Sequence, residues 1–207
     1  MSAIMEFRAL LFSTSIDIPA DARGRIVDLL NVRLADAIDL KTQAKHAHWN
    51  VKGNEFFALH QLFDTIAEHC EQQSDLIAER VTALGGVAQG VVKLVVSNSS
   101  VPEYDLSAIV GEQHIRAVAK GLASFSRQAR ADIEVTERLG DKATADLLTE
   151  IVRQADKDLW FGKLISCPNR EQGVRHSTSA GTRQGQVSRG TDPRSGECWV
   201  RNLGNPS

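Results

Sequence analysis

Two pairs of side chains that bind metals well lie close together in the sequence. His60 and Asp64 are four residues apart, and so are Asp75 and Glu79. At about 100° per residue in a helix, all four side chains fall within about 100° of the circumference and form one polar face. Asp64 and Asp75, however, are about 16 Å apart along the helix axis. A single metal centre therefore cannot use both pairs of one helix.

The two pairs are placed symmetrically about a point between residues 69 and 70. If two copies of this helix cross antiparallel at that point, His60 faces Glu79 of the partner subunit. Asp64 then faces Asp75 of the partner subunit, because a two-fold interface is self-complementary. Two identical sites result, about 22 Å apart, each with ligands from both chains. We therefore predict a metal site that exists only between paired chains.

A third histidine, His48, precedes the segment WNVKGN, in which Gly53 and Asn54 predict a turn. A short antiparallel link would bring His48 close to His60, which gives a site of two imidazoles and three carboxylates. Such a set of nitrogen and oxygen ligands without thiolate suits Fe(II), Mn(II) or Zn(II). One His/Asp pair alone is more often a solvated face, but two pairs in mirror register beside a third histidine favour a metal site.

Glu68 and Glu71 lie on the same polar face and are symmetric about the same point. They could bind metal, or they could be solvated acids at a wet interface. The sequence favours the second interpretation.

The helix that carries these pairs is one of four long helices that the spacing of apolar residues predicts. Pro19 precedes the first helix, and Gly85, Gly86 and Gly140 are suitable stops. The predicted helices span residues 20–50, 55–84, 106–139 and 142–161. Short links join the first two and the last two, and a long link joins the middle pair. This arrangement predicts an all-α four-helix bundle with one long crossover between helices two and three.

The crossover contains the segment VVKLVV, which could form a short strand by propensity alone. A lone strand would have no partner. We therefore expect a long connection with one short helix inside it.

The composition bounds the location and the partners of the protein. The chain has 207 residues and a formal net charge of −2, so nothing global indicates affinity for nucleic acid. Its three cysteines are scattered and include no CxxC pair, which fits a reducing cytosol rather than a disulfide framework. No signal peptide is recognisable, and no apolar stretch approaches the roughly 20 residues needed to cross a bilayer. We expect a cytoplasmic protein without membrane contact.

The composition changes near the end of the fourth predicted helix. Residues 166–207 are rich in Gly, Ser and Arg and nearly free of aliphatic side chains, which predicts a disordered, locally basic tail. Gly162 and Pro168 are expected to stop the helix before it. The predicted organisation is an N-terminal extension over residues 1–15, a helical domain over residues 16–165 and the tail.

Two segments, KHAHWNVKGNEFFALHQLFD and SDLIAERVTALGG, resemble the signature of the Dps family, the mini-ferritins named as DNA-binding proteins from starved cells. The segments SNSSVPEY and DKDLWF resemble the same family, and the resemblance covers residues 16–161. It implies a ferritin-like bundle that assembles into a hollow dodecamer. It also implies intersubunit ferroxidase sites whose ligands match His48, His60, Asp64, Asp75 and Glu79.

The resemblance further implies an enzyme that oxidises Fe(II), preferably with hydrogen peroxide, stores ferric mineral and protects DNA. Trp49 matches a tryptophan beside the family's iron site. It could be a redox-active neighbour, or it could simply pack in the core. Asp141, Asp146 and Glu150 match acids that line an iron-uptake pore at the three-fold axes, although exposed acids on a last helix are often merely solvated.

The sequence departs from the family pattern in two places, and three other functions are considered. The last helix runs into GKLISCPNREQG and the tail, and the lysine-rich N-terminal arm of some relatives is missing, with Arg8 the only base before Arg23. The chain could be a DNA-binding nucleoid protein that acts through its basic tail, or a helical scaffold that binds metal without turnover. A ferritin of twenty-four subunits is disfavoured, because residues 112–114 lack the Glu-x-x-His spacing of its sites.

Overall fold

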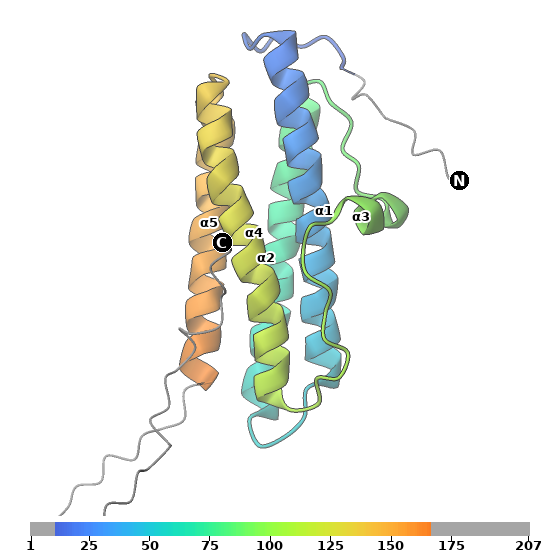
Figure 1. Ribbon diagram of the computed structural model, residues 1–207, viewed down its shortest axis with the longest axis vertical. Helices are drawn as coiled ribbons and strands as arrows, with labels where there is room; N and C mark the ends of the chain where they lie inside the picture. Colours follow the sequence, from blue (N-terminus) through green and yellow to red (C-terminus); the bar gives the residue numbers. More distant parts are fainter. Residues whose placement is uncertain (1–10, 167–207) are drawn as a thin grey trace, which may run out of the picture. The chain divides into compact units, whose positions relative to one another are not determined.

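The computed structural model describes the backbone of residues 11–166 and the side chains of residues 11–163. Every regular element in this range is helical, which confirms the all-α prediction (Figure 1). The helices are α1 (Ala20–Asn50), α2 (Phe56–Ala83), α3 (Val92–Asn98), α4 (Gly111–Arg138) and α5 (Lys142–Ser166). The short helix α3 lies inside the long crossover, as predicted. The predicted N-terminal extension and the tail fall largely outside the described residues and stay predictions.

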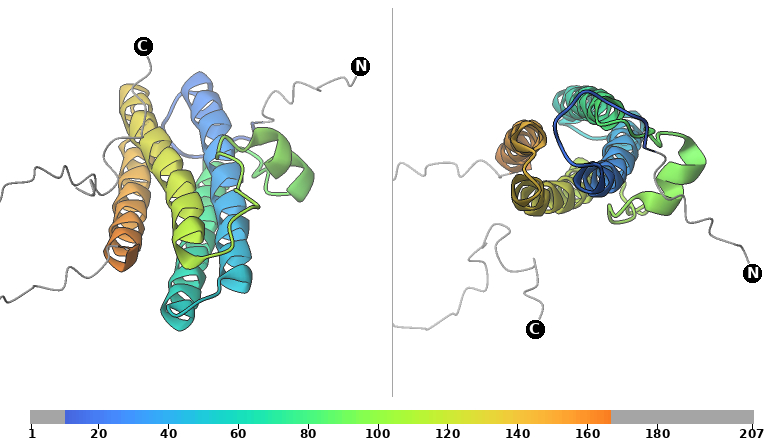
Figure 2. Two further views of the ribbon diagram at one scale, coloured as in Figure 1. Left: turned by 60° about the horizontal axis from the view of Figure 1, so that its bottom comes forward. Right: turned by 90° about the horizontal axis from the view of Figure 1, so that it is seen from above.

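The four long helices form a bundle in which sequence neighbours are paired. α1 packs along α2 and α4 along α5, while α1 also contacts α4 and α2 also contacts α5. α2 and α4 therefore lie diagonally opposite each other (Figure 2). The core between the helices contains the fully buried side chains of Phe63, Phe125, Leu30 and Ile151, each of which stabilises the fold by about 1.5–3 kcal/mol relative to exposure.

Glycine ends two of the helices at the predicted places. Gly85 and Gly140 both have φ of 84°, a left-handed conformation that side chains with a Cβ rarely adopt. Gly85 donates its backbone N–H to the carbonyl of Thr82, and Gly140 donates to that of Glu137. These two residues set the direction in which the chain leaves α2 and α4.

Two predicted helix boundaries are wrong. The third long helix begins at Gly111 rather than near residue 106, because Asp105 accepts the backbone N–H of Ser107 in a turn and Gln113 Oε1 accepts those of Ile109 and Val110. The last helix continues past Gly162 to Ser166. Gly162 is buried, and its Cα faces Ile115 of α4 closely enough that a Cβ would lie 3.6 Å from that side chain. A glycine weakens a helix interior by about 1 kcal/mol, which packing of this kind can offset.

The crossover is fixed to α1 by a buried carboxylate. Asp36 accepts the backbone N–H of Ser100 at 2.6 Å and the hydroxyl of Ser99 at 3.3 Å, and Arg33 forms an ion pair with it at 3.2 Å. Burial raises the pKa of Asp36 despite these partners. Arg33 also reaches Asp132 of α4 at 3.3 Å, and burial raises the pKa of Asp132 to about 6. The SNSS segment thus anchors the long connection.

No helix in the part of the chain that the structure describes is both long enough and apolar enough to span a membrane.

Candidate metal centre

His48 and His60 form a reciprocal pair across the turn between α1 and α2. Nδ1 of each imidazole lies 2.9 Å from the backbone carbonyl oxygen of the other residue, and the two rings stack with centroids 3.6 Å apart. A carbonyl oxygen can only accept, so both Nδ1 atoms carry a proton, and Nε2 is the nitrogen that bears the lone pair in the neutral imidazole. A histidine that ligates metal ordinarily has one ring nitrogen held in this manner.

The turn between the two helices positions these rings. α1 ends at Asn50, and Gly53 adopts φ of 112°, which lets the chain reverse and lets the N–H of Phe56 bond to the Gly53 carbonyl at 3.1 Å. The reversal places the last turn of α1 against the first turn of α2. His48 and His60 meet because they lie near these two facing helix ends.

Asp64 lies one turn further along α2 and joins the same cluster. Its Oδ1 is 3.8 Å from Nδ1 of His48 and 2.5 Å from Nζ of Lys45 on α1. The hydrogen bond from Lys45 lowers the pKa of Asp64, so the carboxylate is ionised at neutral pH. A metal ion at this carboxylate would compete with the Lys45 ammonium for Oδ1.

Asp75 and Glu79 are exposed on α2 and far along it from His60. The structure therefore does not bring all five predicted ligands together in one chain. Among the described residues, no three His, Cys, Asp or Glu side chains converge in a geometry that could hold a metal ion. That result is compatible with a site shared between two chains, which stays a prediction. Glu71 pairs with Lys41 of α1 at 2.6 Å, while Glu68 is exposed.

The indole of Trp49 is 70 % exposed, so it does not pack in the core of this chain. Phe56 and Phe57, at the start of α2, are 43 % and 72 % exposed. These three aromatic side chains belong to the same end of the bundle as His48 and His60. A contiguous exposed patch of such side chains would mark a protein–protein contact.

The prediction that Asp141 lines a pore is wrong, because the structure buries this side chain between α2 and α5. Its side chain is 1 % exposed, accepts two hydrogen bonds from Arg80 of α2 at 2.8 and 2.9 Å, and accepts the backbone N–H of Thr144 at 3.0 Å. It is therefore the N-cap of α5 and a tie to α2. Asp146 and Glu150 are exposed on α5, so the pore prediction now rests on these two residues.

Replacing Asp141 with asparagine is expected to lower the free energy of unfolding by about 3 kcal/mol, because it leaves Arg80 without its buried partner. Burial opposes the charge of Asp141, but the hydrogen bonds from Thr144 and Arg80 outweigh it and hold the pKa below 3.8. The folded-state pKa is depressed, so this contribution is present above the unfolded pKa of 3.8 and is lost as pH falls through the folded-state value. Denaturant titrations at neutral and acidic pH measure both effects. Asp146→Asn, on the exposed face of α5, is the matched control, and equal losses in the two variants would contradict the assignment.

Lys45 and Arg80 are missing from the sequence-based set of important residues. Lys45 lies three residues before His48, so helical spacing places it on the same face and could have revealed it. Arg80 is joined to Asp141 across sixty-one positions of sequence, and no local pattern predicts that contact. The N-cap role of Asp141, by contrast, agrees with its position directly after Gly140 and three residues before Thr144.

Comparison with known proteins agrees with this architecture. A family model described as a ferritin-like domain matches residues 27–165. The bundle with its long crossover and this match define a ferritin-like protein.

The individual relatives narrow the class. The DNA protection during starvation protein of Agrobacterium fabrum is 36% identical over 148 residues, which cover 72% of this chain and 91% of the relative. That of Halobacterium salinarum is 35% identical over 150 residues, covering 70% and 80%. Among solved structures, DpsA14 from Streptomyces coelicolor superposes with a TM-score of 0.72 at 31% identity, covering 76% and 94% of the two chains. An archaeal Dps homologue from Halobacterium salinarum has a TM-score of 0.72 at 30% identity, covering 83% and 99%. The chain belongs to the Dps family.

Proposed function

We propose that this protein is a ferroxidase and an iron-storing mini-ferritin. The observation that carries the proposal is the His48–His60 pair, in which backbone carbonyls hold both Nδ1 atoms, with the ionised carboxylate of Asp64 3.8 Å from Nδ1 of His48. The second half of the site, Asp75 and Glu79, comes from the partner subunit across a two-fold axis. Hard carboxylate oxygens and imidazole nitrogens suit Fe(II) as substrate and favour the ferric product.

The residues of this chain have distinct parts in the reaction. The imidazoles would bind Fe(II) through Nε2, because the backbone carbonyls hold their Nδ1–H groups and fix the orientation of both rings. Asp64 binds as a carboxylate once Lys45 is displaced. Two Fe(II) ions give up two electrons, and one hydrogen peroxide takes them up with two protons to form two waters. Trp49 stands exposed beside the site, where it is available to an oxidant.

Storage follows from assembly into a closed dodecamer in the cytoplasm, with Asp146 and Glu150 attracting cations to a pore. A Dps protein from Microbacterium arborescens is described in a high iron form. It is 27% identical to this chain, and the match covers 74% of this chain and 98% of that protein. Its TM-score of 0.66 shows that the two folds correspond. This likeness supports iron as the cargo.

The experiment that tests the proposal is anaerobic loading of the metal-free protein with Fe(II), followed by hydrogen peroxide. We expect ferric absorbance to rise much faster than in buffer alone, and the iron to elute with the protein on size exclusion. Light scattering should give a particle of about twelve subunits, since two-fold and three-fold contacts close such a shell. Oxidation at the buffer rate, or a stable monomer, would contradict the proposal.

A further inference from the structure

A hollow between α2 and α5 lies apart from the candidate metal centre. It has a volume of about 350 Å³ and is lined by side chains of both helices. This volume is near the low end of the range for ligand sites, which suits a small ligand rather than a macromolecule. The more buried polar side chains of the hollow are His69, Gln73 and Gln154, and its exposed charged side chains are Glu150, Arg153 and Lys157.

The hollow is turned away from the face of α2 through which two chains are proposed to pair. That face carries His60, Asp64, Asp75 and Glu79 and spans about 100° of the helix circumference. At about 100° per residue, His69 lies about 130° from the middle of that face. Pairing through the same face therefore does not cover His69.

The imidazole of His69 is held by a buried carboxylate of α5. Both carboxylate oxygens of Asp158, which is 3% exposed, lie close to Nδ1 of His69, at 3.0 and 3.1 Å. Gln154 donates its amide N–H to Oδ1 of Asp158 at 3.0 Å, and the same nitrogen lies 3.1 Å from Nδ1. Because a carboxylate accepts, Nδ1 donates to Asp158, as in the carboxylate–histidine pairs that orient an imidazole. The other ring nitrogen, Nε2, lies on the side of the ring away from Asp158.

Gln73 supplies an acceptor that the described part of the chain leaves unpaired. It lies one turn beyond His69 on α2, so the two side chains share a face of the helix. Gln73 lines the hollow and is 6% exposed, and its Oε1 has no hydrogen-bond partner among the described residues. A buried acceptor without a partner costs free energy, so a ligand that donates a hydrogen bond is favoured here.

The exposed charged side chains of the hollow favour an anion. Arg153 and Lys157 are four residues apart on α5 and therefore share a face. Lys157 lies over the ring of Phe161, with Nζ 5.9 Å from the ring centroid. Glu150 is the acid among the described side chains that line the hollow. Two cations thus stand against one carboxylate at this position.

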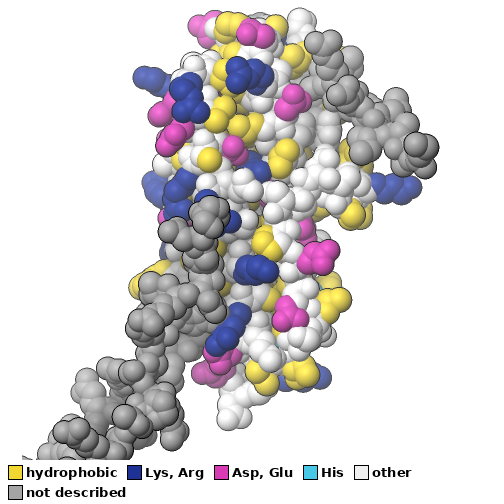
Figure 3. Space-filling model, in the orientation of Figure 1, with side chains coloured by type: hydrophobic (Ala, Val, Ile, Leu, Met, Phe, Trp, Pro, Cys, Tyr) yellow, Lys and Arg dark blue, Asp and Glu magenta, His cyan; other side chains and the backbone are white. Residues whose placement is uncertain are grey.

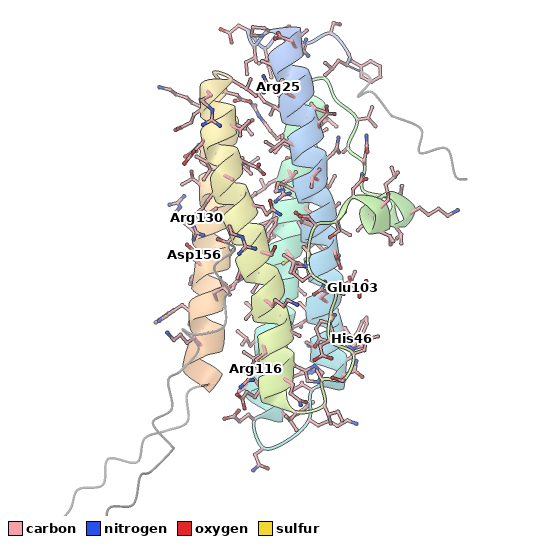
Figure 4. The ribbon with its side chains drawn as sticks, in the orientation of Figure 1. Arg25, His46, Glu103, Arg116, Arg130 and Asp156 are labelled. Carbon is pink, nitrogen blue, oxygen red and sulfur yellow. The ribbon has the colours of Figure 1, made fainter. Side chains whose placement is uncertain are left out.

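Asp156, which lies between Arg153 and Lys157 in the sequence, belongs to the other side of α5. It pairs there with Arg130 of α4 (Figure 4). Figure 3, in the same orientation, shows Lys and Arg side chains mixed with Asp and Glu side chains along that side of the bundle. Asp156 is therefore not one of the side chains that line the hollow.

We propose that the hollow binds hydrogen phosphate, a small oxyanion that also carries a hydrogen-bond donor. Arg153 and Lys157 donate charge-assisted hydrogen bonds to the phosphate oxygens. The P–OH group donates to Oε1 of Gln73, and Nε2 of His69 forms a further hydrogen bond with the anion. The proposal does not depend on iron oxidation.

Calorimetric titration of the full-length, iron-free protein with inorganic phosphate tests the proposal. The variant Arg153→Gln/Lys157→Gln removes both cations of the hollow. The variant Arg138→Gln/Lys142→Gln is the matched control, because it removes one arginine and one lysine from exposed positions outside the hollow. We expect the first variant to bind phosphate at least about tenfold more weakly than the control. Equal binding by the two variants would overturn the proposal, as would a wild-type protein that does not bind millimolar phosphate.

Sulfate tests the part played by Gln73, because it resembles phosphate in shape but carries no proton to donate near neutral pH. We expect the wild type to bind sulfate about tenfold more weakly than phosphate. Sulfate that binds as tightly as phosphate would overturn the assignment of the hollow to hydrogen phosphate.

The variant His69→Gln keeps an N–H group for Asp158 but removes the second ring nitrogen. It should also bind phosphate about tenfold more weakly than the wild type, and an unchanged affinity would overturn the proposal. Particle size and thermal unfolding should match the wild type in the Arg153/Lys157 variant and its control, because all four side chains are exposed. Loss of iron oxidation in the wild type would count against the proposed ferroxidase and not against the phosphate site.

Discussion

Replacing His60 and Asp64 together with alanine is expected to remove the rapid phase of Fe(II) oxidation by hydrogen peroxide. Both side chains belong to the cluster at the α1–α2 turn, and both would bind the iron directly. Loss of a group that only supports a metal ligand costs about 10–100-fold in affinity or activity. Loss of two ligands should therefore slow oxidation by more than about a hundredfold. Stopped-flow absorbance of ferric product measures the change.

The control for this experiment is Gln61→Ala/Thr65→Ala, which changes two exposed side chains on the same helix next to the ligands. Both variants should assemble like the wild type, because none of the four side chains is buried in the core. Unchanged kinetics in the His60/Asp64 variant, with a normal particle, would rule out these residues as ligands.

Mixing two inactive variants should restore about one quarter of the wild-type activity if each site is shared between two chains. His60→Ala and Glu79→Ala each damage both sites of a pair made from identical chains. In a mixed pair, however, one site loses both ligands and the other keeps all of them. Random pairing makes half of all pairs mixed, and half of the sites in those pairs are intact. Co-expression of the two variants, followed by peroxide-driven Fe(II) oxidation, gives the measurement.

The matched control is a mixture of His60→Ala and Asp64→Ala. These two ligands come from the same chain in the mirror arrangement, so every site in a mixed pair lacks one of them and no rescue is expected. Equal rescue in both mixtures, or rescue in neither, would show that the ligands are not divided between the subunits in this manner.

The fold could be predicted from local sequence where one residue decides the conformation. Gly85 and Gly140 end helices because they adopt a left-handed conformation, and the apolar spacing between such stops defines each helix. Prediction failed where specific side-chain contacts determine the conformation. Gly162 was expected to end a helix, but its packing against Ile115 keeps the chain helical. Residues 106–110 were expected to be helical, but Asp105 and Gln113 accept hydrogen bonds from the backbone N–H groups of Ser107 and Ile109 and hold this segment in a turn.

The same distinction between local sequence and specific contacts applies to the candidate site. The positions of His48, His60 and Asp64 follow from helical spacing and one short turn, and the structure brings these three side chains together. The burial of Asp141 depends on Arg80, which lies on another helix. Spacing alone therefore could not distinguish Asp141 from the exposed acids Asp146 and Glu150.

Lys41 and Lys45 of α1 form ion pairs with acidic side chains of α2, and these ion pairs affect how the proposed shell would assemble without iron. Two acidic helix faces brought together at the proposed two-fold axis would repel each other strongly. Lys41 and Lys45, through their contacts with Glu71 and Asp64, act as built-in counter-ions for part of that charge. In the proposed shell these lysines would allow an empty particle to assemble, and iron arriving at Asp64 would displace an ammonium group instead of a proton, because Asp64 is already ionised.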